Sequence, residues 1–355
     1  MKAIKAFFQS VLWILIAACA VCVLLITFLT VTEYQPEDVE KAEVTGTAKG
    51  KTIPTGEPLT ILSWNLGYAG LSREADFAMD GGGNTWRADR ETVLRNLRGI
   101  SDVLEREEPA LMLLQEADSR SSRTYGEDFR KWFALAQNAF ALNYSCPFVP
   151  WPRQIMGRIN SGLLTASDYD VAEAVRISLP CPFSWPVRTI NLKRCLLVSR
   201  LPVEGSDKEL VLINLHLEAY DNGERKIAQM LQLKGLMRSE YEKGNYVIAT
   251  GDFNQVFPGG EEAYPNTHRE NWNVGELEQD NIPEGFSYAY DLETPSCRLL
   301  NQPYDPSDSI NTQYYVIDGA ILSPNVELRE VKTLDEGFAF SDHNPVRFTV
   351  ILSRS

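Results

Sequence analysis

A single uncharged segment near the N-terminus constrains this 355-residue chain more than any other feature of its sequence. Residues 11–31 read VLWILIAACAVCVLLITFLTV, and as an α-helix rising about 1.5 Å per residue they would extend roughly 32 Å, enough to cross the apolar core of a bilayer. Lys2 and Lys5 precede this segment and acidic residues follow it, which places the N-terminus in the cytoplasm. We therefore predict a single-pass cell-membrane anchor over residues 1–34, with the rest of the chain outside the cytoplasm.

Two other interpretations of this segment were weighed against an uncleaved anchor. A cleaved signal peptide has an apolar stretch of about 7–15 residues, which is shorter than the run here. Residues 16–19 (IAAC) resemble the cleavage motif of a bacterial lipoprotein, but the residues after Cys19 continue the apolar run instead of turning polar.

Residues 35–57 are charged, rich in Thr, Gly and Lys, and contain two prolines. That composition predicts a linker.

The remaining residues, 58–355, alternate short apolar runs with helical patterns. Strands are predicted at residues 59–64, 111–114, 163–165, 195–199, 210–217, 246–250, 316–322 and 346–352. Helices are predicted at 90–107, with Val93, Leu94, Leu97, Ile100, Val103 and Leu104 on one face, and at 225–241, with Ile227, Leu231, Lys234 and Leu236 on one face. Because no repeat or second linker is visible, we predict one large α/β (α+β) domain over 58–355.

The net charge disfavours one class of binding partner, and the cysteines leave the disulfide state open. The formal net charge of −14 argues against broad binding to nucleic acid, whose phosphates select for Lys and Arg, so no stable nucleic-acid partner is expected. Four cysteines, at positions 146, 181, 195 and 297, lie beyond the apolar segment. An oxidising exterior permits disulfides, but buried free thiols fit equally well. The sequence leaves the cysteine state and the oligomeric state open.

The candidate catalytic residues are polar residues that end or interrupt the apolar runs. These residues are Asn65, Glu116, His216, Asp252, Asn254, Asp318, Asp342 and His343. Each alone is compatible with a turn or a solvated side chain, but a charge inside the apolar run around Asp318 is costly unless it is paired. Rigid sheets position chemistry at strand ends, so together these residues predict a catalytic site.

The residue types fit metal-assisted hydrolysis of a phosphate ester. Mg²⁺ prefers oxygen ligands and takes one or two carboxylates together with substrate phosphate, and Mn²⁺ is an alternative. Glu116 is the best direct ligand. Asn65 supplies a neutral oxygen or orients a water molecule, and Asp342 is assigned to the same metal site. The metal would offset charge on the phosphoryl oxygens.

The other polar residues fit the activation of a water molecule. His343 is the candidate base, because imidazole titrates near neutral pH. Asp318 would fix its tautomer and stabilise the imidazolium, and Asp252 would orient or deprotonate the water. His216 and Asn254 would donate hydrogen bonds to the non-bridging oxygens in the transition state. Of the three histidines, only His268 has no role in this scheme.

These motifs resemble those of the endonuclease/exonuclease/phosphatase superfamily, in a membrane-anchored, bacterial-type member. The matching segments are SWN (63–65), QE (115–116), NLHLE (214–218), GDFN (251–254), IDGAILS (317–323) and SDHNPV (341–346), in the family's order. Arg225 and Gln229 are similar to an R-x-x-x-Q pair found in many members, which implies that Arg225 contacts substrate. The resemblance implies the DNase I-like fold, a four-layer sandwich of two mixed β-sheets flanked by helices, and a Mg²⁺-dependent phosphoesterase.

The substrate is not named by the motifs, since members of this family cut DNA, sphingomyelin and inositol phosphates. Residues 178–194 place aromatic residues beside basic ones, which fits a lipid headgroup or a stacked base, and we assign Arg194 to substrate binding. We expect a lipid headgroup or other small phosphodiester, with a membrane lipid as partner. The alternatives are a nuclease acting on DNA or RNA, an inositol-phosphate phosphatase, and a catalytically inactive binding protein, which the full catalytic set disfavours.

Overall fold

Two mixed β-sheets form the body of the computed structural model, which describes residues 2–83, 87–149, 156–220, 223–308 and 311–354. The first sheet has the order β1-β7-β8-β9-β10-β16-β13, with bounds Val39–Lys41, Glu173–Ser178, Cys195–Pro202, Glu209–His216, Tyr246–Asp252, Asp318–Leu322 and Ser287–Ala289. The second has the order β17-β18-β3-β4-β6-β5-β2, with bounds Val326–Thr333, Val346–Leu352, Pro58–Asn65, Leu111–Asp118, Gly157–Ser167, Gln137–Val149 and Glu43–Gly46. Within these sheets β9 and β10 run parallel, as do β3 and β4, and the other neighbours are antiparallel.

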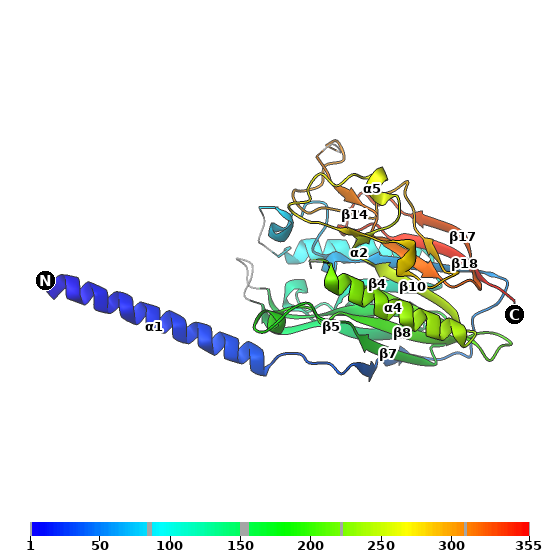
Figure 1. Ribbon diagram of the computed structural model, residues 1–355, viewed down its shortest axis with the longest axis horizontal. Coiled ribbons are helices and arrows are strands. Elements are labelled where there is room, and N and C mark those ends of the chain that lie inside the picture. Colours follow the sequence, from blue (N-terminus) through cyan, green and yellow to red (C-terminus); the bar gives the residue numbers. More distant parts are fainter. Residues whose placement is uncertain (1, 84–86, 150–155, 221–222, 309–310, 355) are drawn as a thin grey trace.

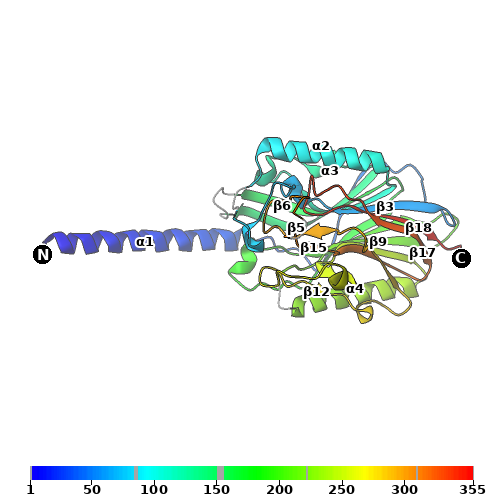
Figure 2. The ribbon, with the colours of Figure 1, turned by 90° about the horizontal axis from the view of Figure 1, so that it is seen from above.

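Helices cover the outer faces of both sheets (Figures 1 and 2). The helices are α1 (Lys2–Val31), α2 (Arg90–Glu107), α3 (Phe129–Trp132), α4 (Glu224–Glu242) and α5 (Gly260–Ala263). Five 3-10 turns lie at Gly67–Ala69, Ala78–Asp80, Ser122–Thr124, Val187–Ile190 and Gln279–Asn281. Two short strand pairs join β11 (Gln255–Val256) to β12 (Gly275–Glu276) and β14 (Cys297–Arg298) to β15 (Tyr314–Tyr315). The predicted four-layer DNase I-like arrangement is confirmed.

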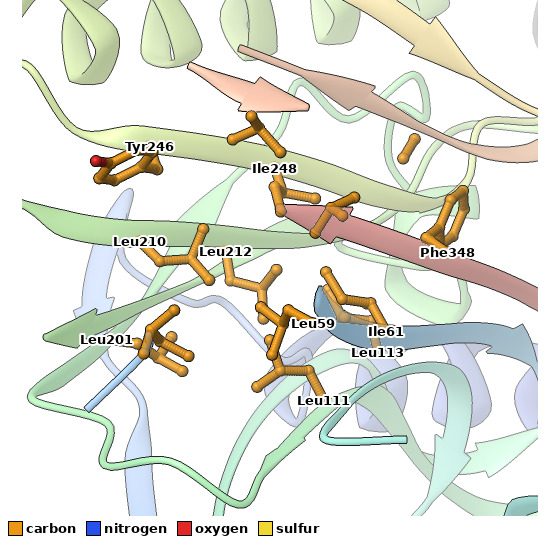
Figure 3. Packing of buried hydrophobic residues seen from close by; sticks show 14 of the residues in the cluster. Leu59, Ile61, Leu111, Leu113, Leu201, Leu210, Leu212, Tyr246, Ile248 and Phe348 are labelled. Carbon is orange, nitrogen blue, oxygen red and sulfur yellow. The ribbon is translucent and has the colours of Figure 1, made fainter. Parts of the chain in front are cut away.

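The main hydrophobic core lies between the two sheets. Figure 3 shows side chains of the second sheet, such as Leu59 and Leu113, facing Leu212 and Ile248 of the first. A second core packs α2 against the outer face of the second sheet, and a third packs α4 against the first sheet. Such packing explains the continuous apolar runs of the central strands, because both of their faces are buried.

The predicted helix at 90–107 matches α2, and its predicted apolar face packs against the sheet. The predicted face of the second helix is wrong. Ile227 and Leu231 are exposed, and α4 instead buries Met230, Leu233 and Met237 together with three polar side chains, those of Lys226, Gln229 and Glu240. The polar side chains are tolerated inside because they reach hydrogen-bond partners. For example, Gln229 accepts the backbone N–H of Glu218 at 2.9 Å.

The predicted linker, residues 35–57, contributes a short edge strand to each sheet. β1 pairs with β7 at the edge of one sheet, and β2 pairs with β5 at the edge of the other. Ile53 is buried in the core between the sheets. Short strands with charged side chains are typical of sheet edges, so composition alone gave no sign of them.

The apolar segment forms a long helix that projects from the domain (Figures 1 and 2). Ile4–Val31 is long and apolar enough to cross a membrane, and it is the one such helix in the described part of the chain. Helices of this kind serve as signal sequences or as anchors.

All six cysteines are free thiols, and Cys146, Cys195 and Cys297 are buried, so the free-thiol alternative holds.

We expect Leu212→Ala to lower the free energy of unfolding by about 2–5 kcal/mol, because Leu212 is fully buried between the sheets and its truncation leaves a cavity. The matched control is Leu231→Ala on α4, where the side chain is 63% exposed and the expected change is within about 0.5 kcal/mol. Urea unfolding of the detergent-solubilised full chain measures both. Equal losses would contradict the described orientation of α4.

Candidate active site

Strand register brings the predicted catalytic residues together. Asp252 ends β10, and its register partners are His216 on parallel β9 and Asp318 on antiparallel β16. Asn65 ends β3 in the facing sheet, and its side-chain amide donates to Asp252 Oδ2 at 3.0 Å. Both sheets therefore deliver polar side chains to one end of the sandwich. This is the arrangement that the strand-end pattern predicts.

His343 and Asp318 form a buried hydrogen-bonded pair. His343 Nδ1 lies 2.8 Å from Asp318 Oδ2, which also accepts the Ser296 hydroxyl at 2.8 Å. Burial lowers the pKa of His343, but Asp318, Cys297 and Asp252 together outweigh burial, and the pKa is raised well above its ordinary value. The other ring nitrogen, Nε2, lies 3.8 Å from Asp252 Oδ2 and 3.5 Å from Asn65 Nδ2. Asp318 thus orients the imidazole and favours its protonated form.

His216 has the opposite electrostatic environment. Its Nε2 lies 3.4 Å from Asp252 Oδ2, and its Nδ1 is buried without a hydrogen-bond partner among the described residues. Burial and the nearby positive charge of Arg194 lower the pKa of His216 well below its ordinary value. His216 is therefore a neutral imidazole at neutral pH. Its ring can donate a hydrogen bond without carrying charge into the site.

Asp252 and Asn254 are fixed by backbone contacts at the end of β10. Asp252 Oδ1 accepts the backbone N–H of Asn254 at 2.9 Å, and burial raises the pKa of Asp252 to about 6. Asn254 adopts a φ of 50°, and its side-chain amide donates to the carbonyl of Leu217 at 2.9 Å. A short turn after the strand therefore directs both side chains to the same place.

Glu116 projects into the site from a break in the β4 ladder. The pairing of β4 with β6 shifts between Leu114 and Ala117, and Glu116 has a φ of 52°. Bulges of this kind re-aim side chains near active sites. Burial raises the pKa of Glu116 to about 7; Arg123 opposes this shift, and the charge of Asp342 adds to it.

Asp342 lies beside the turn that follows β3. Burial raises its pKa, and its Oδ1 accepts the Ser341 hydroxyl at 3.3 Å. A Cβ atom at Gly67, whose φ is 48°, would lie only 2.7 Å from Asp342 Oδ1, so glycine is required there. The backbone N–H of Gly67 also donates to Asn65 Oδ1 at 3.1 Å, which orients the Asn65 amide.

A cavity of about 440 Å³ connects these groups. One wall is polar and is formed by Asn65, Glu116, His216, Asp252, Asn254, Asp342 and His343. The other is largely apolar and aromatic, and is formed by Leu71, Phe77, Met79, Val149, Met156, Ile159, Phe183, Ile190, Leu192, Tyr220, Trp272 and Leu300. The site therefore places charged chemistry beside an apolar surface.

The two predicted substrate-binding residues have different positions. Arg194 lines the cavity and is buried, with its guanidinium donating to Glu218 Oε2 at 3.2 Å and to the carbonyl of His216 at 3.1 Å. Arg225 is exposed on α4 and is not among the described residues that line the cavity. Its neighbour Lys226 points inward instead and donates to the carbonyl of Asn254 at 3.2 Å.

Sequence reasoning missed several residues of the site. Arg123 pairs with Asp118 through two hydrogen bonds, of 2.8 and 2.9 Å, and lies over the ring of Tyr68, 3.7 Å from its centroid. Tyr220 donates to Asp80 Oδ1 at 2.8 Å. These residues lie in loops without apolar periodicity, so nothing in the local sequence marked them. The one local indication was Asp118, a charged residue at the end of a strand-like run, which predicts a positively charged partner such as Arg123.

The site fits a divalent cation. Asp252, Asp318 and His343 form a group that could hold a metal, because their ligand atoms lie within 4.8 Å of one another. Glu116 and Asp342, which the sequence assigns to the metal, line the same cavity, and burial raises the pKa of both. The pKa of each carboxyl stays raised although Arg123 opposes the shift at Glu116 and Arg298 opposes it at Asp342, and oxygen-rich sites of this kind suit Mg²⁺ or Mn²⁺. The identity of the metal is not fixed by these residues.

A family model described as the endonuclease/exonuclease/phosphatase family matches residues 62–343. The chain belongs to this family. It is therefore a phosphoesterase-family protein, and its matched region contains every residue of the cavity's polar wall. No curated protein matches its sequence significantly.

Solved structures of the same fold are distant in sequence. An endonuclease/exonuclease/phosphatase protein from Beutenbergia cavernae is 17% identical, with a TM-score of 0.55, over 83% of this chain and 72% of that one. A family protein from Bacteroides thetaiotaomicron is 14% identical, with a TM-score of 0.52, over 84% and 99%. TDP2 from Caenorhabditis elegans is 16% identical, with a TM-score of 0.51, over 84% and 75%. At these identities the similarity shows the fold alone.

Proposed function

We propose that this chain is a membrane-anchored, metal-dependent hydrolase that cleaves a lipid headgroup phosphoester or another small phosphodiester. The observation that carries the proposal is the cavity itself. His343, hydrogen-bonded to the buried Asp318, lines the cavity with a neutral His216, the buried carboxylates of Asp252 and Asp342 and the half-buried carboxylate of Glu116, beside an apolar wall. This set supplies a base, hydrogen-bond donors and oxygen ligands within one enclosed space.

His343 and Asp252 are the residues proposed to activate water. Asp252 orients the water, and the deprotonated form of His343 accepts the water's proton at Nε2, the ring nitrogen that faces Asp252. Asp318 stabilises the imidazolium that results, through its contact with Nδ1. His216 and the Asn254 amide are proposed to donate hydrogen bonds to the non-bridging phosphoryl oxygens as their charge grows.

Glu116, Asn65 and Asp342 are the residues proposed to hold Mg²⁺, with Mn²⁺ as the alternative. Such a cation neutralises phosphoryl charge and stabilises the leaving oxygen when it is bound. The group of Asp252, Asp318 and His343 is less suited to permanent ligation, because Asp318 and His343 already bind each other at 2.8 Å. Arg194 is proposed to support substrate binding by holding the His216 carbonyl and Glu218 in place.

Retention of α1 as an anchor is supported by contacts at its C-terminal end. Leu29 is buried, and Glu33, two residues beyond the helix, forms a buried ion pair with Lys193 at 2.9 Å. These contacts tie the helix to the catalytic domain. With Lys2 and Lys5 on the cytoplasmic side, the catalytic domain is proposed to lie outside the cytoplasm.

A substrate panel tests this proposal. We expect the detergent-solubilised full chain to hydrolyse sphingomyelin or a phosphoinositide, and an artificial phosphodiester such as bis(p-nitrophenyl) phosphate, in the presence of Mg²⁺. The apolar wall of the cavity favours an ester whose phosphate adjoins an apolar group. Plasmid DNA is the comparison substrate. Cleavage of DNA alone would replace the lipid assignment with a nuclease, and hydrolysis of no ester would leave only the inactive binding protein.

A further inference from the structure

One wall of the cavity is in direct contact with the C-terminal end of the apolar helix. The segment 183–194 follows β7 and contains the turn Val187–Ile190. Phe183, Ile190 and Leu192 from this segment line the cavity. The indole N–H of Trp185 in the same segment donates to the hydroxyl of Thr30 at 3.0 Å, one residue before the last residue of α1. A single loop therefore connects the catalytic cavity to the end of the membrane-crossing helix.

Ion pairs with the buried Glu33 fix this loop to the segment that follows α1. The Glu33 side chain is 2% exposed and contacts Lys193 Nζ at 2.9 Å and Arg188 Nε at 3.3 Å. Removing either partner of a buried pair leaves an uncompensated charge, so the loop and the end of α1 are held in one arrangement. The position of the loop relative to the bilayer is then determined by α1.

Large apolar side chains are exposed at this same end of the domain. Trp185 is 56% exposed, Val187 is 51% exposed and Met79, which lines the cavity, is 55% exposed. We call these three residues the apolar rim. Figures 1 and 2 show that α1 projects from the end of the domain at which α2 and α4 begin, and that the segments carrying the rim lie at this end. The C-terminus lies at the opposite end of the domain.

We infer that the apolar rim is seated in the outer face of the bilayer that α1 crosses, and that the cavity receives a phospholipid or sphingolipid whose acyl chains remain in the membrane. This inference rests on the proposed hydrolysis of phosphoesters and on the retention of α1. Exposed apolar groups next to a cavity mark an interaction surface, and a Trp in the same loop as basic residues is typical of the membrane–water boundary. Because Trp185 contacts the last turn of α1, it lies at the depth where the helix leaves the bilayer.

Fluorescence quenching tests whether the apolar rim lies in the bilayer, and the test does not require enzymatic activity. The full chain is reconstituted into phosphatidylcholine vesicles with either brominated or unbrominated acyl chains, because bromine quenches tryptophan at short range. The chain has seven tryptophans, so Trp185 is isolated by comparing the wild type with Trp185→Phe. We expect brominated lipid to quench a larger amount of fluorescence in the wild type than in Trp185→Phe. Equal amounts would place Trp185 away from lipid and overturn the inference, whatever the enzyme hydrolyses.

A paired activity assay tests the route of the substrate. We expect Trp185→Asp/Val187→Asp to lower the rate on sphingomyelin in vesicles about tenfold more than the rate on bis(p-nitrophenyl) phosphate, since two apolar side chains lose their contact with lipid. Leu231→Asp, an equally exposed apolar position on α4, should lower neither rate. Thr30→Val removes the acceptor of the Trp185 hydrogen bond but leaves the apolar surface in place. This variant should therefore keep most of its rate on sphingomyelin in vesicles.

The outcomes of the two assays distinguish the inference from the proposed function. Equal losses on both substrates in the Trp185→Asp/Val187→Asp variant would overturn the membrane route while leaving phosphoester hydrolysis intact. If no ester is hydrolysed by the wild type, the proposed function fails, and the quenching experiment still decides whether the rim contacts lipid. Sphingomyelin hydrolysis that is kept in the wild type and in Leu231→Asp but selectively reduced in the Trp185→Asp/Val187→Asp variant, with quenching of Trp185, supports both.

Discussion

Replacing His343 by alanine is expected to lower kcat on a phosphodiester by about 10²–10⁴-fold, the range that general-base catalysis contributes. The imidazole is buried, its Nδ1 contacts Asp318 at 2.8 Å, and its Nε2 faces Asp252 at 3.8 Å. No other described side chain offers an imidazole in this orientation. Initial rates of the full chain at saturating substrate and Mg²⁺ measure the effect.

His268→Ala is the matched control for this experiment. His268 lies in a loop outside the cavity, with its ring 3.8 Å from the exposed Glu270. Its removal should leave kcat within about twofold, as for most surface substitutions. Equal losses in the two variants would show that His343 has no special role. Loss of the fold is separated from loss of chemistry by comparing the thermal unfolding of each variant.

Asp318→Asn extends the test to the residue that positions His343. The substitution keeps the shape of the side chain but removes the negative charge that raises the pKa of His343. A base with a lower pKa is deprotonated at lower pH, so the acid limb of the pH profile of kcat/KM should move to lower pH while the rate falls. A purely structural role would reduce the rate without moving this limb.

Glu116→Gln is expected to lower activity at fixed Mg²⁺ by about 10²-fold or more, because a direct carboxylate ligand supplies several kcal/mol of metal binding and charge stabilisation. Raising the Mg²⁺ concentration should recover part of the loss. Glu105→Gln, an exposed Glu on α2, is the matched control and should show no change. Retention of full activity in Glu116→Gln would remove Glu116 from the proposed metal site.

The same substitution has the opposite effect on stability when metal is absent. Burial raises the pKa of Glu116 from 4.5 to about 7, so this carboxyl group destabilises the fold increasingly as the pH rises from 4.5 to about 7, and the full cost is present at pH 8. In EDTA at pH 8 we therefore expect Glu116→Gln to have a higher Tm than the wild type. Added Mg²⁺ should raise the Tm of the wild type by more than that of the variant. A lower Tm for the variant in EDTA would contradict this electrostatic account.

Much of the catalytic centre could be predicted because its residues end buried strands. Asp252 and Asp318 interrupt apolar runs, and the register of β10 with its neighbours places them side by side. Local sequence could not indicate the exposed edge strand β17, which is charged at four of its eight residues, or the large shift in the face of α4. Lys226 and Gln229 are buried because loops distant in sequence supply their partners, and periodicity contains no information about such loops.

The position of the apolar rim next to the membrane helix could not be predicted from local sequence either. The aromatic and basic residues of 178–194 were visible in the sequence, but their relation to the membrane helix depends on two contacts, Trp185 with Thr30 and Lys193 with Glu33. These contacts join residues about 155–160 positions apart. Only the assembled structure shows that the catalytic cavity and the end of α1 share a loop.

The most direct test of the central claim is the metal dependence of phosphodiester hydrolysis by the purified full chain. Initial rates on bis(p-nitrophenyl) phosphate are measured in Mg²⁺, after EDTA treatment, and after Mg²⁺ is restored, for the wild type and for His343→Ala. The account predicts hydrolysis that is abolished by EDTA, returns with Mg²⁺, and is nearly absent in His343→Ala under all three conditions. A rate that survives EDTA, or that survives the loss of His343, would contradict a metal-dependent phosphoesterase centred on this cavity.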